Sequence, residues 1–442
     1  MQRFAILALP FPSHIRALEA LASQLVNLGH AVIWIHQADV QKFLADQRIG
    51  FCTVGVHSHP AGSLEPMLRH AANPGGLMGL RRVIHDIAKN TEMLCREGPD
   101  VIKNLKITAV IADQMEAAGG LLAESLSIPF ISVACALPIN REVAVPLPVM
   151  PWAYATSQRA IELNKTSTGI YDWLMKPHAR VIARYSKSFG LPLKTTLEDC
   201  LSPLAQISQT TADFDFPRTN LPAHFHHAGP LRAAVKPGGR LNFPVNPLRP
   251  FVFASLGTLQ GGRFGLFRRI ARACKALQMQ LLIAHCNHLD ARQERLLREA
   301  GATWVTGFAD QQAAVKMANV VVTHGGLNTV LDALAAGTPL LALPIAFDQP
   351  GVAARVAHAK AGLKLAPRWA TESSIANALS RLVNDPSFAD EARRLGQSLA
   401  LAGGCYQASH IVLSAIDRYP VLKTTALERT PSCFHESPAY AA

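Results

Sequence analysis

The sequence predicts an α/β protein with two Rossmann-like, doubly wound domains. Two observations predict this fold class. In both halves of the chain, short apolar runs alternate with amphipathic helical stretches that end at glycine, which is the pattern of βαβ units in a parallel sheet. A stretch rich in proline and glycine, residues 233–250, separates the halves and has the composition of a linker. The 442 residues suffice for two domains of ordinary size.

The composition is that of a folded protein with reduced thiols. Hydrophobic residues make up 49% of the chain and charged residues 17%, which allows a large core and excludes wholesale disorder. Eight cysteines are scattered without a CxxC pair, so we expect a cytoplasmic protein rather than a disulfide scaffold or a zinc ribbon. No uninterrupted apolar run reaches about 18 residues, so we expect no membrane-spanning helix.

The chain is basic, with a formal net charge of +12 and a pI of about 9.5. Such a charge suits anionic partners. The sequence contains no long Lys/Arg tract and no nucleic-acid motif, so we expect no nucleic-acid partner. An anionic membrane surface is the more specific interpretation, and diffuse charge without any partner is the alternative.

The first half opens with a strand, a helix and a second strand. We expect strands at residues 4–9 and 31–35, with a helix over 15–28 that Ser13 caps. His14 then lies at the carboxyl end of the first strand, where open α/β sheets bind ligands. A histidine there can act as a general base, because its ordinary pKa suits proton removal near neutral pH. A helix-capping or merely solvated histidine is the alternative.

An acid follows a later strand of the same half. Residues 107–111 form a short apolar run, and Asp113 comes just after it. Strand carboxyl ends share one edge of a parallel sheet, so Asp113 is expected near His14. A carboxylate on the far ring nitrogen would fix the tautomer of His14 and stabilise its imidazolium. A solvated aspartate at a strand end is the alternative. A further strand is expected at 130–136.

Two histidine clusters and a DxD sequence could suggest a metal site. The clusters, at 57–59 and 224–227, lack matching ligands at a zinc-site spacing, so we interpret them as exposed loop histidines. The DxD at 213–215 precedes a proline-rich stretch and is set aside. We therefore predict no metal.

The second half contains a stretch that is suited to bind an anion. Residues 320–323 are a β-branched run, Gly325 and Gly326 allow a tight turn, and a helical stripe from Leu327 ends at Gly337. The free N–H groups and partial positive charge at the helix start favour a phosphate. No Lys-Ser/Thr follows the glycines, so the stretch is not a P-loop. An ordinary βαβ turn is the alternative. Further strands of this half are expected at 251–254, 281–284, 304–306 and 340–343.

The residues of this stretch and beyond resemble a known signature. His324-Gly-Gly, Asn328-Thr329, an acid at 332, Gly-Thr-Pro at 337–339 and Asp348-Gln349 together resemble the donor site of nucleotide-sugar glycosyltransferases of the GT-B fold, glycosyltransferase family 1. The resemblance implies two Rossmann-like domains that face each other across a cleft. It also implies a UDP-sugar donor in the second domain and an acceptor in the first.

The resemblance assigns a role to each matching residue. It implies contact with the diphosphate for Thr258, His324, Gly326, Asn328 and Thr329, with uracil for Phe308, with the base or ribose for Gln311, with the ribose hydroxyls for Asp332 and with the sugar for Asp348 and Gln349. Two positions depart from the family pattern. Phe308 replaces the usual Trp, which is a larger stacking platform. Asp332 replaces the usual Glu and is one methylene shorter.

The resemblance also fixes the expected organisation and chemistry. It implies an acceptor domain (1–232), a linker (233–250), a donor domain (251–404), a helix that crosses back (405–419) and a tail (420–442) that we expect to be disordered. His14 and Asp113 match the family's catalytic pair. A single in-line displacement would invert the anomeric carbon, and no metal or other cofactor is needed because the helix start and His324 would stabilise the leaving diphosphate.

Further motifs narrow the acceptor. The 10–18 opening, Asp113-Gln-Met-Glu116, residues 253–261 and residues 347–351 resemble those of bacterial zeaxanthin glucosyltransferases of carotenoid biosynthesis. The resemblance implies UDP-glucose as donor and the ring hydroxyls of zeaxanthin as acceptor, with one or two glucoses added. The apolar segments 60–78 and 138–152 are candidate walls of the acceptor pocket, or else core or lid segments. A glycosyltransferase for a macrolide, flavonoid or sterol, a UDP-sugar 2-epimerase and a non-catalytic binding protein remain alternatives.

Overall fold

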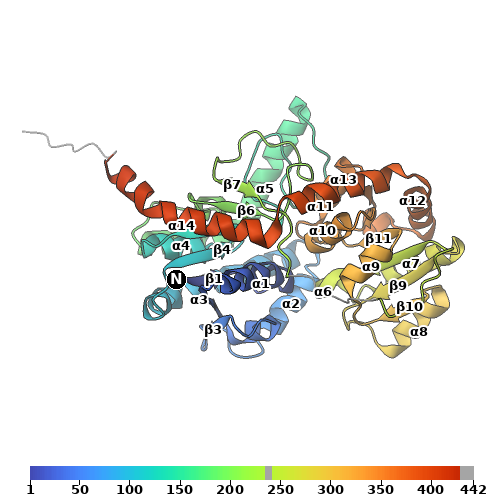
Figure 1. The fold of residues 1–442 in the computed structure, drawn as a ribbon, viewed down its shortest axis with the longest axis horizontal. Coiled ribbons are helices and arrows are strands. Elements are labelled where there is room, and N and C mark those ends of the chain that lie inside the picture. Colours follow the sequence, from blue (N-terminus) through green and yellow to red (C-terminus); the bar gives the residue numbers. More distant parts are fainter. Residues whose placement is uncertain (234–240, 429–442) are drawn as a thin grey trace, which may run out of the picture.

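The structure is a computed structural model that describes residues 1–233 and 241–428. Figure 1 shows two α/β domains side by side, each built on a parallel sheet with helices on both faces. The first sheet lies within residues 3–227 and the second within residues 251–364. Part of the predicted linker, residues 234–240, falls outside the described residues.

The first sheet has the strand order β3-β2-β1-β4-β5-β6-β7, with every neighbouring pair parallel. Its strands are β1 (Arg3–Leu7), β2 (Ala31–His36), β3 (Gly50–Thr53), β4 (Ala109–Asp113), β5 (Phe130–Ala134), β6 (Gln206–Ser208) and β7 (Phe225–His227). Its helices are α1 (Pro12–Asn27), α2 (Leu64–Ala72), α3 (Gly76–Asn104), α4 (Ala118–Ser125) and α5 (Gln158–Ser188), with 3₁₀ turns η1 (Ala38–Phe43) and η2 (Glu198–Cys200). In β1, Phe4 and Ile6 enter one apolar cluster and Ala5 and Leu7 another, so the sheet is buried on both faces.

The second sheet has the order β10-β9-β8-β11-β12-β13, again parallel throughout. Its strands are β8 (Phe251–Ser255), β9 (Gln280–Ala284), β10 (Trp304–Thr306), β11 (Val320–Thr323), β12 (Leu340–Ala342) and β13 (Gly362–Lys364). Its helices are α6 (Gly257–Gln260), α7 (Phe264–Ala276), α8 (Ala291–Ala300), α9 (Gln311–Met317), α10 (Leu327–Ala335), α11 (Gln349–His358), α12 (Glu372–Asn384) and α13 (Ser387–Leu401), with a 3₁₀ turn η3 (Pro367–Trp369).

Several elements differ from the sequence-based expectation. Helix α1 begins at Pro12, with Phe11 rather than Ser13 at the N-cap, because proline is preorganised for the first helical position. His14 therefore lies in the first turn of α1 and not in a preceding loop. Strand β4 starts and ends two positions later than expected, so Asp113 is its last residue. The register pairs Phe4 with Ala109, which carries the strand up to Asp113.

The interpretation of residues 224–227 as an exposed loop is wrong. Residues Phe225–His227 form the half-buried strand β7, and Nδ1 of His227 lies 3.1 Å from the carbonyl oxygen of Thr210. This strand is short and polar, so its sequence lacks the apolar run that marks the central strands.

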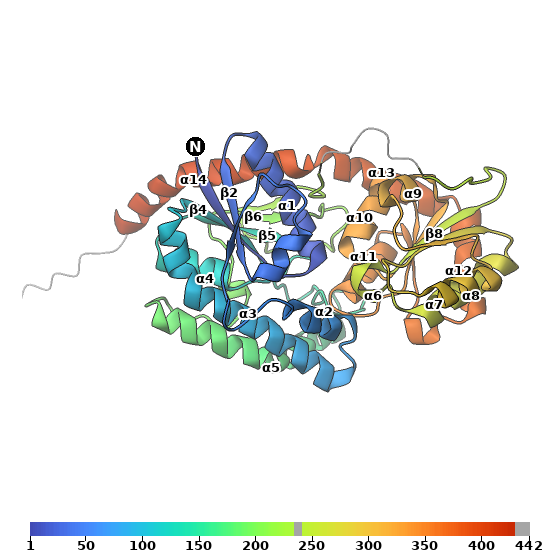
Figure 2. The same cartoon turned by 90° about the horizontal axis from the view of Figure 1, so that it is seen from below.

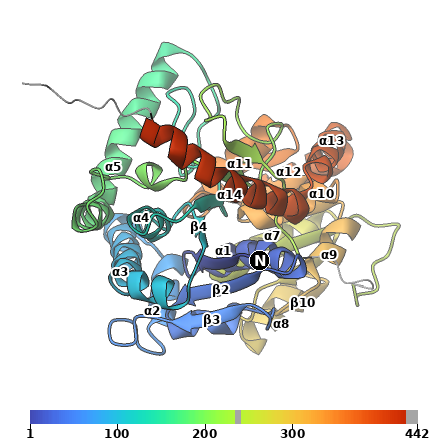
Figure 3. The ribbon, with the colours of Figure 1, turned by 60° about the vertical axis from the view of Figure 1, so that its left-hand side comes forward.

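Helix α14 (Gly404–Glu428) returns from the second domain and crosses the first (Figures 1 and 3). It packs on α1, and Ala408, Val412 and Ala415 are buried there. The helix passes residue 419, where we expected it to end, since the proline at position 420 removes one donor without stopping the helix. The rest of the predicted tail, residues 429–442, lies outside the described residues.

One stretch of the described chain, Ser387–Tyr419, is long and apolar enough to cross a bilayer by length and composition. In the structure it is two helices, α13 and α14, separated at Gly403, which has a φ of +83°. Leu395 and Leu399 of α13 are buried against the second domain. The apolar composition thus serves packing between helices and sheets, as in the core helices of many globular proteins.

A buried ion pair joins the domains. Nε of Arg355 on α11 donates to Oδ1 of Asp215 at 2.6 Å, and both side chains are almost fully buried. Arg218 donates to the other oxygen of the same carboxylate at 3.0 Å, and the guanidinium of Arg355 stacks over the Phe216 ring at 4.2 Å. The DxD sequence set aside above therefore supplies an interdomain contact.

We expect Arg355→Ala to destabilise the protein by about 3 kcal/mol, because it leaves Asp215 buried with Arg218 as its one remaining cationic partner. Equilibrium urea unfolding measures the change. Arg394→Ala is the matched control, since Arg394 is exposed and its pairs with Asp213 and Glu391 contribute little. Equal losses for the two variants would show that the interdomain pair does not stabilise the fold.

Candidate active site

The two domains enclose one large cavity of about 1790 Å³. It is lined by residues that follow the carboxyl ends of strands in both sheets, which is where parallel α/β sheets bind ligands. The volume exceeds that of a pocket for a single small molecule, about 300–1,000 Å³. The cavity can therefore hold two substrates at once, and every residue predicted for donor binding or catalysis, apart from Asp113, lines it.

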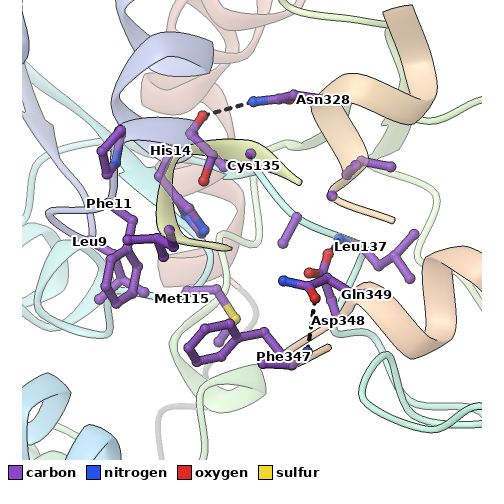
Figure 4. Close-up of a pocket in the computed structure, with 18 of the residues that line it drawn as sticks. Leu9, Phe11, His14, Met115, Cys135, Leu137, Asn328, Phe347, Asp348 and Gln349 are labelled. Atoms are coloured by element: carbon purple, nitrogen blue, oxygen red, sulfur yellow. Dashed lines mark hydrogen bonds between the residues drawn. The ribbon is translucent and has the colours of Figure 1, made fainter. Parts of the chain in front are cut away.

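The structure brings the predicted catalytic pair together. Nδ1 of His14 lies 2.6 Å from Oδ2 of Asp113. The Asp113 carboxylate also accepts from the backbone N–H groups of Leu9 at 3.3 Å and Met115 at 3.0 Å, and it is 1% exposed. These bonds fix the carboxylate, which in turn orients the imidazole. With Nδ1 engaged, Nε2 is the ring nitrogen left for a substrate, and Figure 4 shows the His14 ring at the cavity.

The pKa of His14 is raised above its ordinary value. Burial alone would lower it, but the charge and hydrogen bond of Asp113 outweigh burial, and the charge of Asp348 adds to them. The imidazolium that forms when His14 takes a proton is therefore stabilised. This is the electrostatic setting that a general base needs.

A buried polar network that sequence reasoning missed lies behind Asp113. Glu116 is buried and accepts hydrogen bonds from Asn90 at 2.7 Å, from Thr91 at 2.7 Å and from the N–H of Ala118 at 3.0 Å. Burial raises the pKa of Glu116 to about 7. Its own N–H donates to the carbonyl of Asp113, so the network holds the turn that carries the catalytic carboxylate. The Asp-Gln-Met-Glu spacing was visible in the sequence, but nothing there placed its partners.

Cys135 joins the catalytic pair. One atom of each side chain that could bind a metal, from His14, Asp113 and Cys135, lies within 4.8 Å of the other two. Burial raises the pKa of the Cys135 thiol well above its usual range, so the thiol is neutral, and a metal would have to displace that proton and the His14–Asp113 hydrogen bond. That no metal takes part stays a prediction.

The predicted anion cradle has the expected backbone form. Strand β11 leads into Gly325, with a φ of +81°, and α10 begins at Leu327 with Gly326 as its N-cap. A side chain on Gly326 would lie 2.6 Å from the ring of His324, and one on Gly257 would lie 2.5 Å from it. The two glycines thus leave room for the imidazole at the helix start. Burial lowers the pKa of His324 to about 4, so it is a neutral hydrogen-bond donor and not a cation.

Asn328 and Thr329, both predicted diphosphate contacts, lie in the first turn of α10. Asn328 donates from Nδ2 to the carbonyl oxygen of Ser13 in the first domain at 3.0 Å, while its Oδ1 is buried without a partner. Thr329 is buried at the cavity wall. Asn328 therefore bridges the domains next to His14, which the sequence did not indicate.

The residues that were predicted to bind the uracil base and the ribose lie together. They are joined by an arginine that sequence reasoning missed. Phe308 is 59% exposed at the cavity and free to stack on a base. Gln311 donates to Oδ2 of Asp332 at 2.7 Å, and Arg232 donates to Oδ1 at 2.7 Å. Both oxygens of Asp332 are thus engaged, so a ribose would have to share or replace these bonds. Arg232 also reaches the carbonyl oxygen of Asn328 at 2.9 Å.

The predicted sugar contacts lie opposite His14 (Figure 4). Asp348 is half-buried, its Oδ2 accepts from the N–H of Leu137 at 3.3 Å, and desolvation raises the pKa of its carboxyl group. The Gln349 side-chain oxygen accepts from the N–H groups of residues 345 and 346, which leaves its NH₂ group for a ligand. Thr258 lies in α6 at the cavity, and its carbonyl accepts from His288 at 2.7 Å.

Comparison with known proteins shows to which family the chain belongs. Residues 12–399 match the model of the "UDP-glucoronosyl and UDP-glucosyl transferase" family. The chain belongs to this family. A zeaxanthin glucosyltransferase of Pantoea ananas is 48% identical over 93% of this chain and 95% of that protein. One of Pseudescherichia vulneris is 43% identical over 94% and 98%.

Solved structures agree on the fold. The calicheamicin glycosyltransferase CalG4 superposes with a TM-score of 0.72 at 19% identity, covering 95% of this chain and 99% of that one. The glycotransferase of kitacinnamycin gives a TM-score of 0.73 at 17% identity, covering 94% and 99%. The predicted GT-B fold is confirmed, and the protein is a UDP-dependent glycosyltransferase with a cavity between its domains.

We expect Gly326→Ala to lower kcat/KM for the nucleotide sugar about tenfold or more, because the new methyl group displaces the His324 ring from the cradle. Gly326 has a φ of −62°, so the substitution adds no backbone strain. Steady-state kinetics at varied donor concentration measure the change. Gly265→Ala is the control, since nothing lies within 4 Å of a side chain there. Unchanged donor kinetics would remove His324 from the diphosphate site.

In the pH profile of kcat/KM, we expect the acid limb to have an apparent pKa above 6.5, the ordinary value for histidine. The reason is that His14 must be neutral to take a proton and its pKa is raised. Asp113→Asn removes the larger of the two influences that raise the pKa of His14 and leaves burial opposed by Asp348 alone, so the acid limb should move to lower pH and the plateau should fall about a hundredfold or more. The control is Asp86→Asn, which breaks the His70–Asp86 pair at 2.7 Å outside the cavity. A limb that does not move in Asp113→Asn would contradict the pairing.

Proposed function

We propose that the protein transfers glucose from UDP-glucose to the hydroxyl groups of zeaxanthin, giving the mono- and di-β-glucoside in carotenoid biosynthesis. Two relatives with this activity in their names, at more than 40% identity over nearly the whole chain, support the proposal. The observation that carries it is a cavity that is lined by the donor cradle, by His14 of the His14–Asp113 pair and by an extensive apolar wall, which we call the apolar chamber.

The apolar chamber suits a long hydrocarbon acceptor. Its walls come from α3, α5 and the loop 135–150, and include Ile84, Ile87, Leu147, Val149, Met150, Leu174, Met175 and Ile182. Of the two predicted wall segments, 138–152 contributes Leu147 to Met150. Segment 60–78 contributes only residues 74–76, while Leu64 and Met67 are core residues. Zeaxanthin is polar only at its two ring hydroxyls, so one such ring can reach His14 while the polyene stays in apolar surroundings.

The proposed transfer step uses the catalytic pair and the donor cradle. Nε2 of His14 takes the proton from the acceptor hydroxyl, and the oxygen forms a bond to the anomeric carbon of glucose. The bond from that carbon to the diphosphate oxygen breaks, and UDP leaves with the electron pair. Attack opposite to the leaving group inverts the anomeric carbon, so an α-linked donor yields a β-glucoside. Asp113 stabilises the imidazolium and stays ionised.

Stabilisation of the leaving diphosphate comes from the cradle. The N–H groups at the start of α10, the neutral His324 and the Thr329 hydroxyl lie at the cavity and would donate to the oxygens on which negative charge develops. We propose on this ground that no metal or other cofactor takes part. Asp348 and Gln349 would bind the glucose hydroxyls, and Phe308 the uracil ring.

The proposed location is the cytoplasm, at the inner face of the membrane that holds the pigment. The cysteines at 52, 95, 135, 200, 274, 286 and 405 are all free thiols, which suits a reducing compartment. The net charge of +12 favours peripheral attachment to anionic lipid.

To test the proposal, the purified protein is incubated with UDP-glucose and zeaxanthin in detergent micelles. The molecular mass of the pigment is then measured by mass spectrometry. We expect a gain of one and two hexoses. Product from another alcohol alone would move the protein to a different acceptor class, and conversion of the UDP-sugar without acceptor would favour an epimerase.

We expect His14→Ala to bind UDP as tightly as the wild type but to lose transfer by about 10²–10⁴-fold, because only proton removal is lost. Isothermal titration with UDP and the same product assay measure the two effects. His70→Ala is the control, since that histidine pairs with Asp86 away from the cavity. Undiminished turnover in His14→Ala would eliminate it as the base.

A further inference from the structure

Four large apolar side chains are exposed where α3 and α5 lie against each other. They are Leu77 (53% exposed), Met78 (85%), Ile170 (53%) and Trp173 (49%), and we call them the α3–α5 patch. Figure 2 shows the two helices running side by side along the lower edge of the first domain. Arg81, one helical turn after Leu77, places its guanidinium over the Trp173 ring at 5.9 Å, so the two halves of the patch are continuous. Clustered exposure of this kind marks an interaction surface.

Both helices of the patch carry cations. Their exposed basic side chains include Arg81, Arg82, Lys89, Lys165, Lys176 and Arg180. The carboxylates nearest in sequence are largely engaged. Asp86 pairs with His70 at 2.7 Å, Asp172 with Arg141 at 2.6 Å, and Glu162 accepts from Gln158 at 2.8 Å. Apolar side chains beside lysine and arginine complement an anionic bilayer, where the apolar groups enter the interface and the cations meet phosphates.

The patch adjoins the mouth of the cavity. Gly75, Gly76 and Leu80, which flank Leu77 and Met78, line the cavity, and so does Ile170 of the patch itself. The same cavity is lined further along these helices by apolar residues such as Ile84 and Ile87 of α3 and Leu174 of α5, and it is also lined by His14. One cavity therefore connects the patch residue Ile170 with His14.

We propose that the α3–α5 patch is a docking surface for an anionic lipid bilayer and that the acceptor enters the cavity directly from that bilayer. The second part rests on the proposed function, because it takes the acceptor to be a membrane-dissolved alcohol. The first part does not, and can be tested without any substrate.

The test is cosedimentation of the full chain with vesicles of phosphatidylcholine, with and without phosphatidylglycerol. The variants are Met78→Ser/Trp173→Ser, which removes apolar groups, and Arg81→Glu/Arg82→Glu, which reverses the local charge. The matched control is Arg368→Glu/Trp369→Ser. Arg368 also stacks over a tryptophan, at 5.4 Å, and Trp369 is 68% exposed, but neither lines the cavity.

We expect the wild type and the control to bind anionic vesicles more than neutral ones, and binding to fall with added salt. Each patch variant should bind anionic vesicles at least about tenfold less, since it loses either apolar burial or two phosphate-facing cations. Turnover of zeaxanthin in vesicles should fall with binding, while turnover in detergent micelles should stay unchanged, because none of the four substituted residues lines the cavity.

Equal vesicle binding by the patch variants and the control would overturn the proposal, as would binding that ignores anionic lipid and salt. Self-association of the wild type in size-exclusion chromatography that the patch variants abolish, without vesicle binding, would make a second copy of the chain the occupant and also overturn it. Loss of vesicle binding in the variants with no zeaxanthin product from any form would retain the docking surface and reject the acceptor.

Discussion

The site depends on one constraint: each parallel sheet presents its carboxyl ends at a single edge, and the two edges face each other across the cavity. β1 and β4 place His14 and Asp113 at one edge, and β11 places His324 at the other. His14 and Asp113 are brought together by short connections at the strand ends, without a long loop. Because β1, β4 and β11 are each buried on both faces, these positions are set by the cores of the domains and not by surface loops.

Several of the contacts that join the two domains involve or adjoin predicted site residues. Asn328 donates to Ser13 next to His14, and Arg355, on the helix that begins at Gln349, pairs with Asp215. Arg232 connects the end of the first domain to Asp332 in the donor site. If a donor binds Asp332 as predicted, it will compete for a bond that also links the domains, and we expect occupancy of that site to be coupled to closure of the cavity.

Much of this was predictable because the informative signals are local. The central strands are uninterrupted apolar runs, and β10 and β11 match their predicted bounds. Short polar strands such as β6 and β7 exist through their neighbours in the sheet, which no local pattern reports. Helices α3 and α5, which line the apolar part of the cavity, contain Pro99 and Pro177, and proline signals the end of a helix rather than its continuation.

For the site, the type of each residue was readable but its hydrogen-bond partners were not. The sequence put His14 and Asp113 at one edge, yet only the fold supplies their 2.6 Å contact. It offered Asp332 as a ribose ligand, but Arg232 and Gln311, distant in sequence, already engage that carboxylate. The Glu116 network escaped notice for the same reason, because burial and partners arise only when helices far apart in the chain pack together.

The return of α14 to the first domain has a mechanical consequence. The chain passes between the domains near Arg232 and again near Gly404, and these two crossings touch: the N–H of Gly404 donates to the carbonyl oxygen of Ala228, and the thiol of Cys405 to that of Arg232. Two adjacent crossings act as one pivot. If the second domain rotates about it, atoms near the pivot, such as the Asp332 carboxylate that Arg232 contacts, would travel least and the far rim of the cavity would travel most. The predicted ribose site would then stay almost in place while the opposite rim of the cavity closes.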